Sequence, residues 1–329
     1  MTPDSASADQ QKFAGEDVLR GYIADLSNWG RWGEDDKLGA LNLVGPEEVL
    51  RAVATVESGR TISCTLPLDQ SGPQRGLLRN NPRNVMVATG TDHVSGAQDE
   101  LPAGLGPAYG FGRSDDMLIV PNQAGTAWDA LSHVFWEGHM WNGRSAALVS
   151  SHGAAVNGIE GYAGKMIMRG VLLDIARSKQ VETLEPGYAI SIEDLEAAAE
   201  FGGVEVMKGD AVLVRTGHLG ARRGEWGDFA GGPTPGLSVH TAPWLHAKNI
   251  AAVATDTWAL EVRPSELGVF QPLHIIALVH IGLALGEMFD LDQLASSCAE
   301  LNRYQFLLAA PTLPITGASG SPTPVIAVM

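Results

Sequence analysis

Short apolar runs alternate with amphipathic and turn-rich segments along most of the chain. Runs such as Val-Leu-Leu and Ala-Ala-Val-Ala have no polar face, which is typical of strands buried on both faces of a sheet. The pattern predicts strands at 61–66, 171–175, 211–215, 250–255 and 304–309, and helices at 46–58, 192–201, 241–247, 272–280 and 291–299. This alternation of strands and helices predicts an α/β fold with a mixed central sheet.

No linker divides the chain, so we expect a single domain over residues 16–329. Residues 1–15 are rich in Ser, Ala, Asp and Gln, a composition that predicts disorder. Residues 69–121 are dense in Gly, Pro and Asn with weak periodicity, and we expect them to be ordered and partly stranded rather than a disordered insertion. Residues 311–329 form a C-terminal arm long enough to reach a neighbouring subunit.

The charge of the chain excludes several classes of partner. The formal net charge is −16, with no basic cluster to neutralise phosphates, so nucleic acid and anionic membranes are not expected partners. No apolar run reaches the length of a membrane span, and the polar N-terminus does not resemble a secretory signal. These features predict a cytoplasmic protein. Cys64 and Cys298 are expected to be buried free thiols.

Candidate chemistry is concentrated between Gln123 and His133, where Asp129 and His133 follow a Gly-Thr turn. If the segment after Thr126 is helical, a spacing of four puts both side chains on one face. A carboxylate beside an imidazole fixes the ring tautomer and raises its basicity, as a general base requires. The pair could also bind a metal, form a surface ion pair, or cap a helix.

This stretch resembles the signature His-x-Gly-Thr-His-x-Asp-x-x-x-His of the cyclase family of metal-dependent hydrolases, which includes kynurenine formamidases and isatin hydrolases. Gly125, Thr126, Asp129 and His133 match, whereas Gln123 and Ala127 stand where the signature has its two leading histidines. Ordered landmarks of the family continue in this chain at 135–138, 169–174, 209–217, 235–237, 255–257, 273–274 and 285–287. The blocks at 28–33 and 313–317 resemble the longer bacterial and fungal members.

The resemblance implies a swivelling β/β/α fold and assembly as a homodimer or homotetramer. Carried over by position, Asp129 would bind or bridge metal, and His133 would be the acid/base histidine. His274 and Glu287 would complete a metal position. Asp256 follows a strand, where α/β sites commonly gather functional groups.

The available donors limit what metal site the chain can build. Asp129, His274 and Glu287 supply the three protein ligands that a catalytic zinc uses, with the Gln123 amide as a weak oxygen donor. Ala127 has no donor atom, so a two-metal site is not expected. An oxygen-rich set suits Mn²⁺ or Mg²⁺ better than a thiolate-seeking ion. A single Mn²⁺ or Zn²⁺ and a metal-free site both remain open, and no motif for a nucleotide or organic cofactor is present.

Several residues near the motif are candidates for binding the substrate. Trp128, Phe135 and Trp136 would suit a flat, partly aromatic ligand, although such rings also occur in cores and at subunit contacts. His139 or His152 could fold back and replace a lost imidazole, and His218 could line the pocket at a strand end. Each of these histidines could equally be structural.

The sequence therefore predicts a hydrolase-type enzyme that acts on a C–N or C–O bond of a small molecule such as an amide, lactam, lactone or formamide. Cyclic and aromatic molecules are among the candidate substrates. A metal-independent cyclase, dehydratase or isomerase on the same fold is the alternative, since His133, Asp129, His274 and Glu287 suffice for acid/base chemistry. A non-catalytic small-molecule binder is a third possibility.

Overall fold

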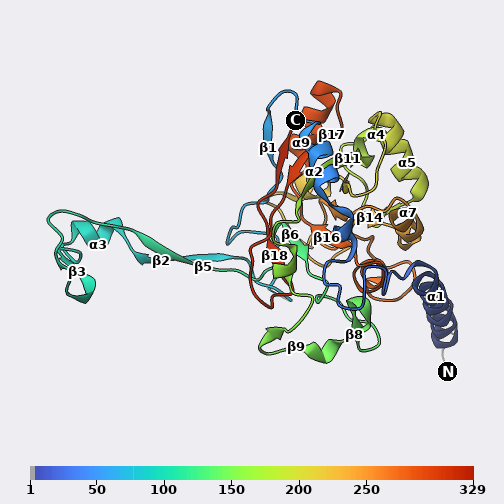
Figure 1. Ribbon diagram of the computed structural model, residues 1–329, viewed down its shortest axis with the longest axis horizontal. Helices are drawn as coiled ribbons and strands as arrows, with labels where there is room; N and C mark the ends of the chain where they lie inside the picture. Colours follow the sequence, from blue (N-terminus) through green and yellow to red (C-terminus); the bar gives the residue numbers. More distant parts are fainter. Residues whose placement is uncertain (1–3, 77) are drawn as a thin grey trace.

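A curled mixed sheet forms the centre of the molecule in the computed structural model, which describes residues 4–76 and 78–329 (Figure 1). In this part of the chain the sheet has nine strands in the order β1-β19-β17-β11-β13-β15-β16-β6-β18. Along the chain these are β1 (Thr61–Ser63), β6 (Ala127–Asp129), β11 (Ile167–Asp174), β13 (Ala211–Arg215), β15 (Ala252–Thr255), β16 (Ala284–Glu287), β17 (Gln305–Ala309), β18 (Gly320–Pro322) and β19 (Ile326–Val328). The α/β fold with a mixed central sheet and a single domain is as predicted.

The middle of the sheet is parallel and its two sides are antiparallel. β11, β13, β15 and β16 run in parallel, with Val171 opposite Val212 and Val212 opposite Val253. Their side chains are buried on both faces, as the unbroken apolar runs predict. β17 joins one side antiparallel to β11, and β6 joins the other antiparallel to β16. The carboxyl ends of the parallel strands therefore meet at one edge.

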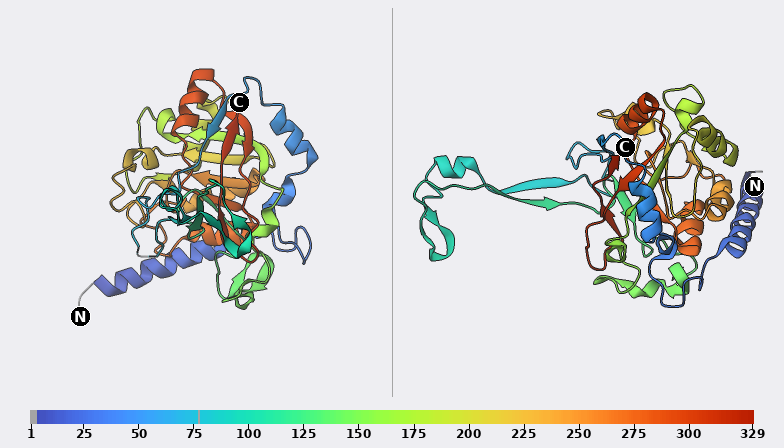
Figure 2. Two further views of the ribbon diagram at one scale, coloured as in Figure 1. Left: turned by 90° about the vertical axis from the view of Figure 1, so that its left-hand side faces the viewer. Right: turned by 45° about the horizontal axis from the view of Figure 1, so that its top comes forward.

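Helices connect the strands and cover the sheet (Figure 2). α2 packs on β11 and β17, and α5 and α4 contact β11 and β13 respectively. The helices are α2 (Pro46–Val53), α4 (Ile175–Ser178), α5 (Ile192–Phe201), α6 (His218–Arg222), α7 (Ala242–Ala247), α8 (Pro272–His274) with the π-helical η7 (Ile275–Ile281), and α9 (Asp292–Leu301). The helix predicted at 272–280 thus begins as an α-helix and continues with wider turns.

Short elements complete the connections. They are η1 (Gly39–Leu43), η3 (Trp141–Gly143), η4 (Ala146–Leu148), η5 (Ile159–Tyr162) and η6 (Val239–Thr241), with the two-stranded pairs β7 (His139–Met140) and β8 (Arg144–Ser145), β9 (Val149–Ser150) and β10 (Gly153–Ala154), and β12 (Ala189–Ile190) and β14 (Gly236–Leu237).

Both ends of the chain differ from expectation. Residues 4–15, for which the composition predicted disorder, lie in helix α1 (Asp4–Leu26), whose later residues contact η7 and α7; residues 1–3 lie outside the described chain. Residues 311–329 do not extend away as an arm. They return along the sheet as β18, beside β6, and as β19, between β17 and β1. Apolar residues such as Val325, Ala327 and Met329, all buried, explain this return.

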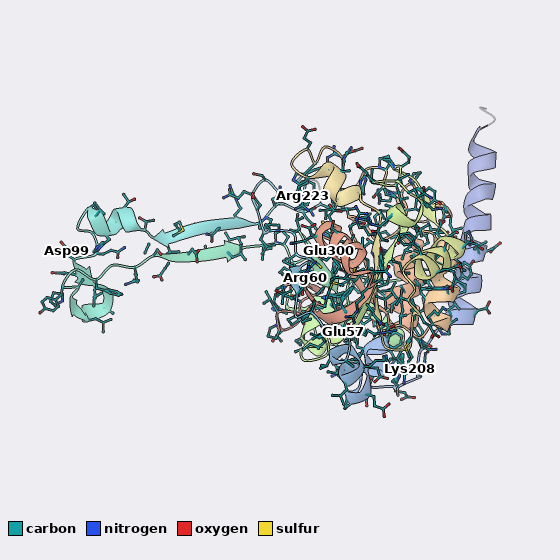
Figure 3. All side chains as sticks on the ribbon, turned by 90° about the horizontal axis from the view of Figure 1, so that it is seen from above. Glu57, Arg60, Asp99, Lys208, Arg223 and Glu300 are labelled. Carbon is teal, nitrogen blue, oxygen red and sulfur yellow. The ribbon has the colours of Figure 1, made fainter. Side chains whose placement is uncertain are left out.

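Residues 83–119 project from the body as a long ribbon, which we call the ribbon arm (Figure 1). β2 (Arg83–Ala88) pairs antiparallel with β5 (Asp115–Ile119), and the tip carries α3 (Gly90–Val94), β3 (Glu100–Leu101) and β4 (Gly106–Pro107). Asp99 lies at the far end (Figure 3). The expectation of an ordered, partly stranded section is met, but only the roots of the arm approach the strand β6 and its neighbours.

Two further expectations concern the thiols and membranes. Cys64 and Cys298 are free and buried, as predicted. Across residues 4–76 and 78–329, no helix combines the length and the apolar character that crossing a bilayer requires.

Candidate functional site

β6 sets the orientation of the motif residues. Ala127 lies directly opposite Glu287 on β16, and Asp129 lies opposite Leu285, so all four side chains point to the same face of the sheet. The segment after Thr126 is therefore a strand, not the helix that would have aligned Asp129 with His133. Alternation along the strand keeps Ala127 and Asp129 together and sends the residue between them to the other face.

That residue, Trp128, is fully buried in the core. Its Nε1 donates to the Ala310 carbonyl oxygen at 3.0 Å, and its ring packs edge-on against Phe289 with centroids 5.0 Å apart. The expectation that Trp128 binds substrate is contradicted, because the period of two of a strand places it on the face opposite Asp129.

A buried histidine lies between two carboxylates beside Asp129. His274 Nδ1 is 2.5 Å from Glu261 Oε1, and His274 Nε2 is 3.2 Å from Glu287 Oε1. The Glu261 carboxylate also accepts the backbone N–H groups of Leu273 and His274, so it fixes both the ring and the start of α8. Burial lowers the pKa of His274, but the two carboxylates outweigh it and raise this pKa to about 10.

Asp129 supplies the third charged group of this cluster. One donor atom from each of Asp129, His274 and Glu287 lies within 4.8 Å of the others, and all three side chains are buried. Asp129 Oδ2 is buried and has no hydrogen-bond partner. Burial raises the pKa of Asp129; the charge of Glu287 acts in the same direction, and His133 acts against it. An unpartnered buried carboxylate oxygen indicates a position at which a cation or a donor binds.

His133 reaches Asp129 through a turn rather than a helix. Its backbone N–H donates to the Ala130 carbonyl at 2.9 Å, and its Nε2 lies 3.7 Å from Asp129 Oδ1. Its Nδ1 faces the Gln123 amide nitrogen at 3.4 Å. The His133 side chain is 23% exposed whereas that of Asp129 is 2% exposed, so the imidazole is the member of the pair that solvent and small molecules can reach.

The Gln123 side chain packs against β18, where residue 320 is a glycine and leaves room for it. A Cβ on Gly320, the partner of Asp129 on β18, would lie 2.3 Å from Gln123 Nε2. The buried Gln123 amide therefore borders His133, and the structure brings together Gln123, Asp129 and His133 with His274 and Glu287 as expected.

The other predicted residues near the motif are exposed or contact other parts of the chain. Phe135 is exposed, and Trp136 packs partly against the core with the Arg20 guanidinium 5.9 Å from its ring centroid. His139 is exposed and its Nδ1 lies 2.9 Å from the Glu137 carbonyl oxygen. His152 is exposed in a turn. Within the described residues, neither histidine joins the potential metal ligands, so neither replaces the imidazole missing at Ala127.

His218 and Asp256 lie at the carboxyl ends of β13 and β15. The His218 ring stacks on Phe229 with centroids 5.4 Å apart, and burial lowers the pKa of His218 to about 4. Asp256 accepts hydrogen bonds from Thr216 N, Thr216 Oγ1 and Gly217 N. These bonds close the turn after β13, which gives Asp256 a structural role.

Sequence reasoning missed Glu261 and the polar groups that flank the cluster. Glu261 is an acid within the otherwise apolar run 258–262, and that contrast was a signal that could have revealed it. Gln74 Nε2 donates to the Ala124 carbonyl at 3.0 Å and lies 3.9 Å from Met288 Sδ, next to Glu287. Gln74 comes from the weakly periodic section, so its proximity could not be read from spacing.

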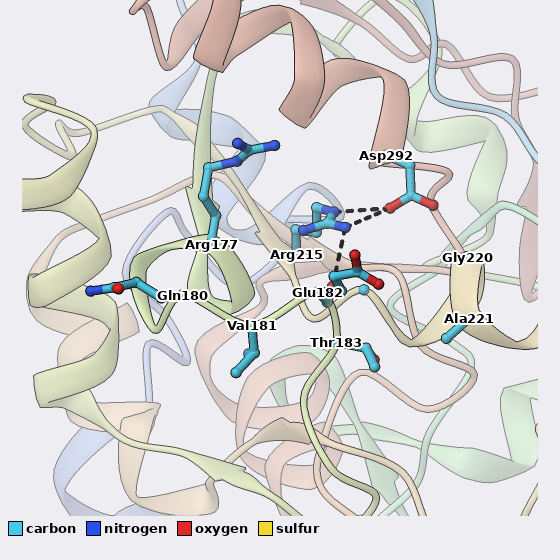
Figure 4. Close-up of a pocket in the computed structure, with 10 residues that line it drawn as sticks. Arg177, Gln180, Val181, Glu182, Thr183, Arg215, Gly220, Ala221 and Asp292 are labelled. Atoms are coloured by element: carbon cyan, nitrogen blue, oxygen red, sulfur yellow. Dashed lines mark hydrogen bonds and ion pairs between the residues drawn. The ribbon is translucent and has the colours of Figure 1, made fainter.

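The hollow at the carboxyl end of β13, with a volume of about 660 Å³, is a different region (Figure 4). Arg215 forms ion pairs with Asp174 and Asp292, at 3.0 and 2.9 Å, and Arg177 also pairs with Asp174. These arginines of the hollow are therefore already neutralised by carboxylates of the chain. Neither Asp129 nor His133 lines the hollow. This hollow therefore offers no reactive pair comparable to that of Asp129 and His133.

The donor set at Asp129 fits a divalent metal ion. It combines two carboxylates and one imidazole, and Asp129 Oδ2 lacks another partner. The bond from Glu261 to His274 Nδ1 leaves Nε2 directed at the cluster, which is the arrangement that commonly orients metal-binding histidines. Ala127 offers no donor, so the geometry suits one ion rather than two.

Comparison with known proteins identifies the relatives of this fold. A family model described as "Putative cyclase" matches residues 62–262, more than half of the chain. The chain belongs to the cyclase family. A crystal structure described as a novel cyclase is 35% identical, covers 93% of this chain and 99% of its own, and superposes with a TM-score of 0.84. Among curated protein sequences, none matches.

More distant cyclase-family structures share the fold. Isatin hydrolase A from Labrenzia aggregata, bound to benzyl benzoate, is 20% identical with a TM-score of 0.59, covering 85% of this chain and 98% of its own. A "predicted metal-dependent hydrolase" from Bacillus stearothermophilus is 15% identical with a TM-score of 0.51, covering 82% and 97%. The family assignment places the chain among enzymes, with a fold shared by hydrolases.

Proposed function

We propose that this cyclase-family enzyme hydrolyses a C–N or C–O bond in a small amide, lactam, lactone or formamide, and that the substrate is cyclic or aromatic. The observation that carries the proposal is the buried, unpartnered Asp129 Oδ2 beside the partly exposed His133. A carboxylate that orients an accessible imidazole is the arrangement that activates water. The reaction class is supported by the isatin hydrolase and the metal-dependent hydrolase that share this fold.

In the proposed reaction His133 accepts a proton from water while the water oxygen bonds to the substrate carbonyl carbon. Asp129 holds the imidazole and stabilises the imidazolium that forms. The C–N or C–O bond then breaks, and the proton passes from His133 to the leaving nitrogen or oxygen. The products are a carboxylic acid and an amine or an alcohol.

Asp129, His274 and Glu287 are the residues that would hold one divalent ion, Mn²⁺ or Zn²⁺, which when bound would polarise the substrate carbonyl. Glu261 would keep the His274 ring directed at the ion. The Gln123 amide would orient His133 from the other side.

Elemental analysis of protein purified without chelator tests the metal part of the proposal. Near-stoichiometric Mn or Zn in the wild type, lost in Asp129→Asn and kept in the surface variant Glu300→Gln, is the expected result. Hydrolysis of a panel of aromatic lactams and formamides, abolished in Asp129→Asn and His133→Gln, would complete the test. If the purified wild type contains only trace metal and binds neither Mn²⁺ nor Zn²⁺ when these are added, the protein is not a metal-dependent hydrolase.

A metal-independent cyclase, dehydratase or isomerase is the second candidate. One observation favours it: both ring nitrogens of His274 already have carboxylate partners within the chain, Glu261 and Glu287. A site closed by its own ion pairs can perform acid/base chemistry without a metal. Chelation discriminates the two, because it abolishes turnover by the hydrolase and leaves turnover by the second candidate unchanged.

A further inference from the structure

A cavity of about 290 Å³ lies beside the Asp129 cluster and carries positive charge in an acidic protein. Arg79 and Arg263 line it from different parts of the chain, with Arg75 at its exposed rim. The apolar side chains of Leu78 and Phe270 complete its mouth. A net charge of −16 makes a local gathering of arginines unusual for this surface.

The two half-buried arginines keep their charge uncompensated by the chain. Arg79 Nη1 donates to the Gln123 carbonyl at 3.3 Å, and Arg263 Nη2 donates to the Gly231 carbonyl at 3.0 Å. Neither forms an ion pair with a carboxylate of the described residues, and Arg263 Nε is buried without a hydrogen-bond partner. Two guanidinium groups in one small cavity repel each other, and a bound anion would relieve that repulsion.

Aromatic rings hold these guanidinium groups in place. The Cζ atoms of Arg79 and Arg263 lie 5.8 and 5.7 Å from the Trp258 ring centroid, and Arg263 Cζ lies 5.5 Å from that of Phe270. A guanidinium that packs over a ring keeps its N–H edges free for hydrogen bonds in its own plane. The rings therefore pre-orient planar forks, which match the geometry of a carboxylate.

Contacts of Gln74 and Gln123 link the lining of the cavity to the residues around the reactive cluster. Trp258 Nε1 lies 3.3 Å from Gln74 Oε1, and Gln74 Nε2 lies 3.9 Å from Met288 Sδ, next to Glu287. Arg79 bonds to the main chain of Gln123, whose side chain contacts His133. Arg79 is also near enough for its charge to lower the pKa of Asp129, against the effect of burial.

We propose that the cavity between Arg79 and Arg263 binds a carboxylate carried by the substrate, and that this group selects anionic small molecules with an apolar or aromatic body. The proposal rests on the proposed hydrolase function for the place of the reacting bond, which would lie toward Asp129 and His133. The carboxylate end would be held by the two guanidinium forks and the apolar body by Leu78 and Phe270.

Calorimetric titration with benzoate, benzamide and phenyl phosphate tests the inference without any turnover. All three have one ring, but only benzoate carries the planar anion. We expect benzoate to bind the wild type about 10–100-fold more tightly than benzamide, because hydrogen bonds to a charged partner are the stronger ones. Equal affinity for benzoate and benzamide, or tighter binding of phenyl phosphate than of benzoate, would overturn the proposal.

Variants locate the binding. Arg79→Gln and Arg263→Gln should each remove most of the preference for benzoate, whereas Arg83→Gln, which changes an exposed arginine at the root of the ribbon arm, should leave it unchanged. Thermal unfolding checks that each variant folds, and Arg263→Lys provides a second version that keeps the charge and should keep part of the preference. Retention of the full preference in both glutamine variants would place the anion elsewhere.

Titration of Asp129→Asn separates this inference from the proposed function. A metal at Asp129 could itself attract benzoate, so a preference that survives in Asp129→Asn belongs to the arginine cavity. If the wild type turns over no lactam or formamide but keeps the arginine-dependent preference, the hydrolase proposal fails and the anion site stands. If neutral lactams are hydrolysed while benzoate and benzamide bind equally, the hydrolase stands and the anion site fails.

Discussion

The Glu261 carboxylate holds His274 at two points: it lies 2.5 Å from the ring Nδ1 and 3.0 Å from the backbone nitrogen of the same residue. One acid thus sets both the start of α8 and the direction of the imidazole. This link explains why a buried acid lies in an otherwise apolar part of the chain, since without His274 its charge would have no compensating partner. The geometry around Asp129 therefore depends on a residue that does not itself face the reactive cluster.

Replacing Glu261 by glutamine should test that dependence. Glutamine keeps the size of the side chain but weakens the hold on His274 Nδ1, and loss of such supporting carboxylates typically lowers metal affinity or activity by about 10–100-fold. We expect Glu261→Gln to bind the divalent ion more weakly than the wild type does, as measured by competition with a fluorescent chelator. Glu266→Gln, which removes a carboxylate bonded to Ser238, is the matched control. Unchanged metal affinity in Glu261→Gln would show that α8 alone positions the ring.

Substitution of His133 should abolish turnover without affecting folding. The side chain is partly exposed and lies in a turn, so His133→Gln should leave the unfolding temperature close to that of the wild type. Loss of a general base typically lowers the rate by about 10²–10⁴-fold. Steady-state kinetics on a substrate found in the panel would measure kcat. A kcat within twofold of the wild type would remove His133 from the catalytic role.

Ala127→His should raise metal affinity. Ala127 lies opposite Glu287 and on the same face as Asp129, so an imidazole there would add a donor to the cluster. The position is buried, and the extra volume should cost about 1–3 kcal/mol of stability. We expect more metal per protein by elemental analysis and a lower unfolding temperature. Trp128→His is the control, because Trp128 lies next to Ala127 but points into the core. This variant should be less stable and should bind no additional metal.

Stability should fall on acidification because of His218. Burial lowers its pKa from 6.5 to about 4, so the unfolded chain binds more protons than the folded chain between these two values. Stability is therefore fully present above about pH 6.5 and is lost as the pH falls toward about 4, by up to about 3 kcal/mol. His218→Phe, which preserves stacking on Phe229, should flatten this part of the profile. Urea unfolding at several pH values is the measurement, with the exposed His152→Gln as control.

The ribbon arm should be covered by another copy of the chain in solution. A two-stranded ribbon is marginally stable alone in water, and this one exposes many apolar side chains on both faces: Val85, Met86, Val87, Val94, Leu105, Tyr109, Phe111, Met117, Leu118 and Ile119. Such a surface favours association. We expect light scattering to show a homodimer or homotetramer, and replacement of residues 84–118 by a Gly-Gly turn to give a monomer. A monomeric wild type would contradict this prediction.

The sequence predicted the buried central strands well, because apolar runs such as those within 211–215 and 250–255 have no polar face and suit a strand covered on both sides. It also placed Asp129, His133, His274 and Glu287 in one site through the family resemblance, and their proximity is observed. It did not predict the conformation of the motif: a spacing of four suggested a helix, but pairing with β16 and β18 makes Ala127–Asp129 a strand and turns Trp128 into the core.

Long-range contacts account for what the sequence could not predict. Arg79 and Arg263 are far apart along the chain and neither belongs to a motif, so only the folded structure shows that they share a cavity. The return of residues 311–329 into the sheet depends on open strand edges at β6 and β17, which a local pattern does not reveal.

The pairing of β6 sets a constraint on how the protein matures during synthesis. β6 carries Asp129 and pairs with β16 and β18, so the strand that bears the motif has both neighbours only after residues 320–322 have been synthesised. At about 5–20 residues per second, the ribosome adds the intervening roughly 190 residues in about 10–40 s. During that interval nascent chains contain the motif but lack an assembled site. Chains released before β18 is made should therefore be inactive whatever else they have folded.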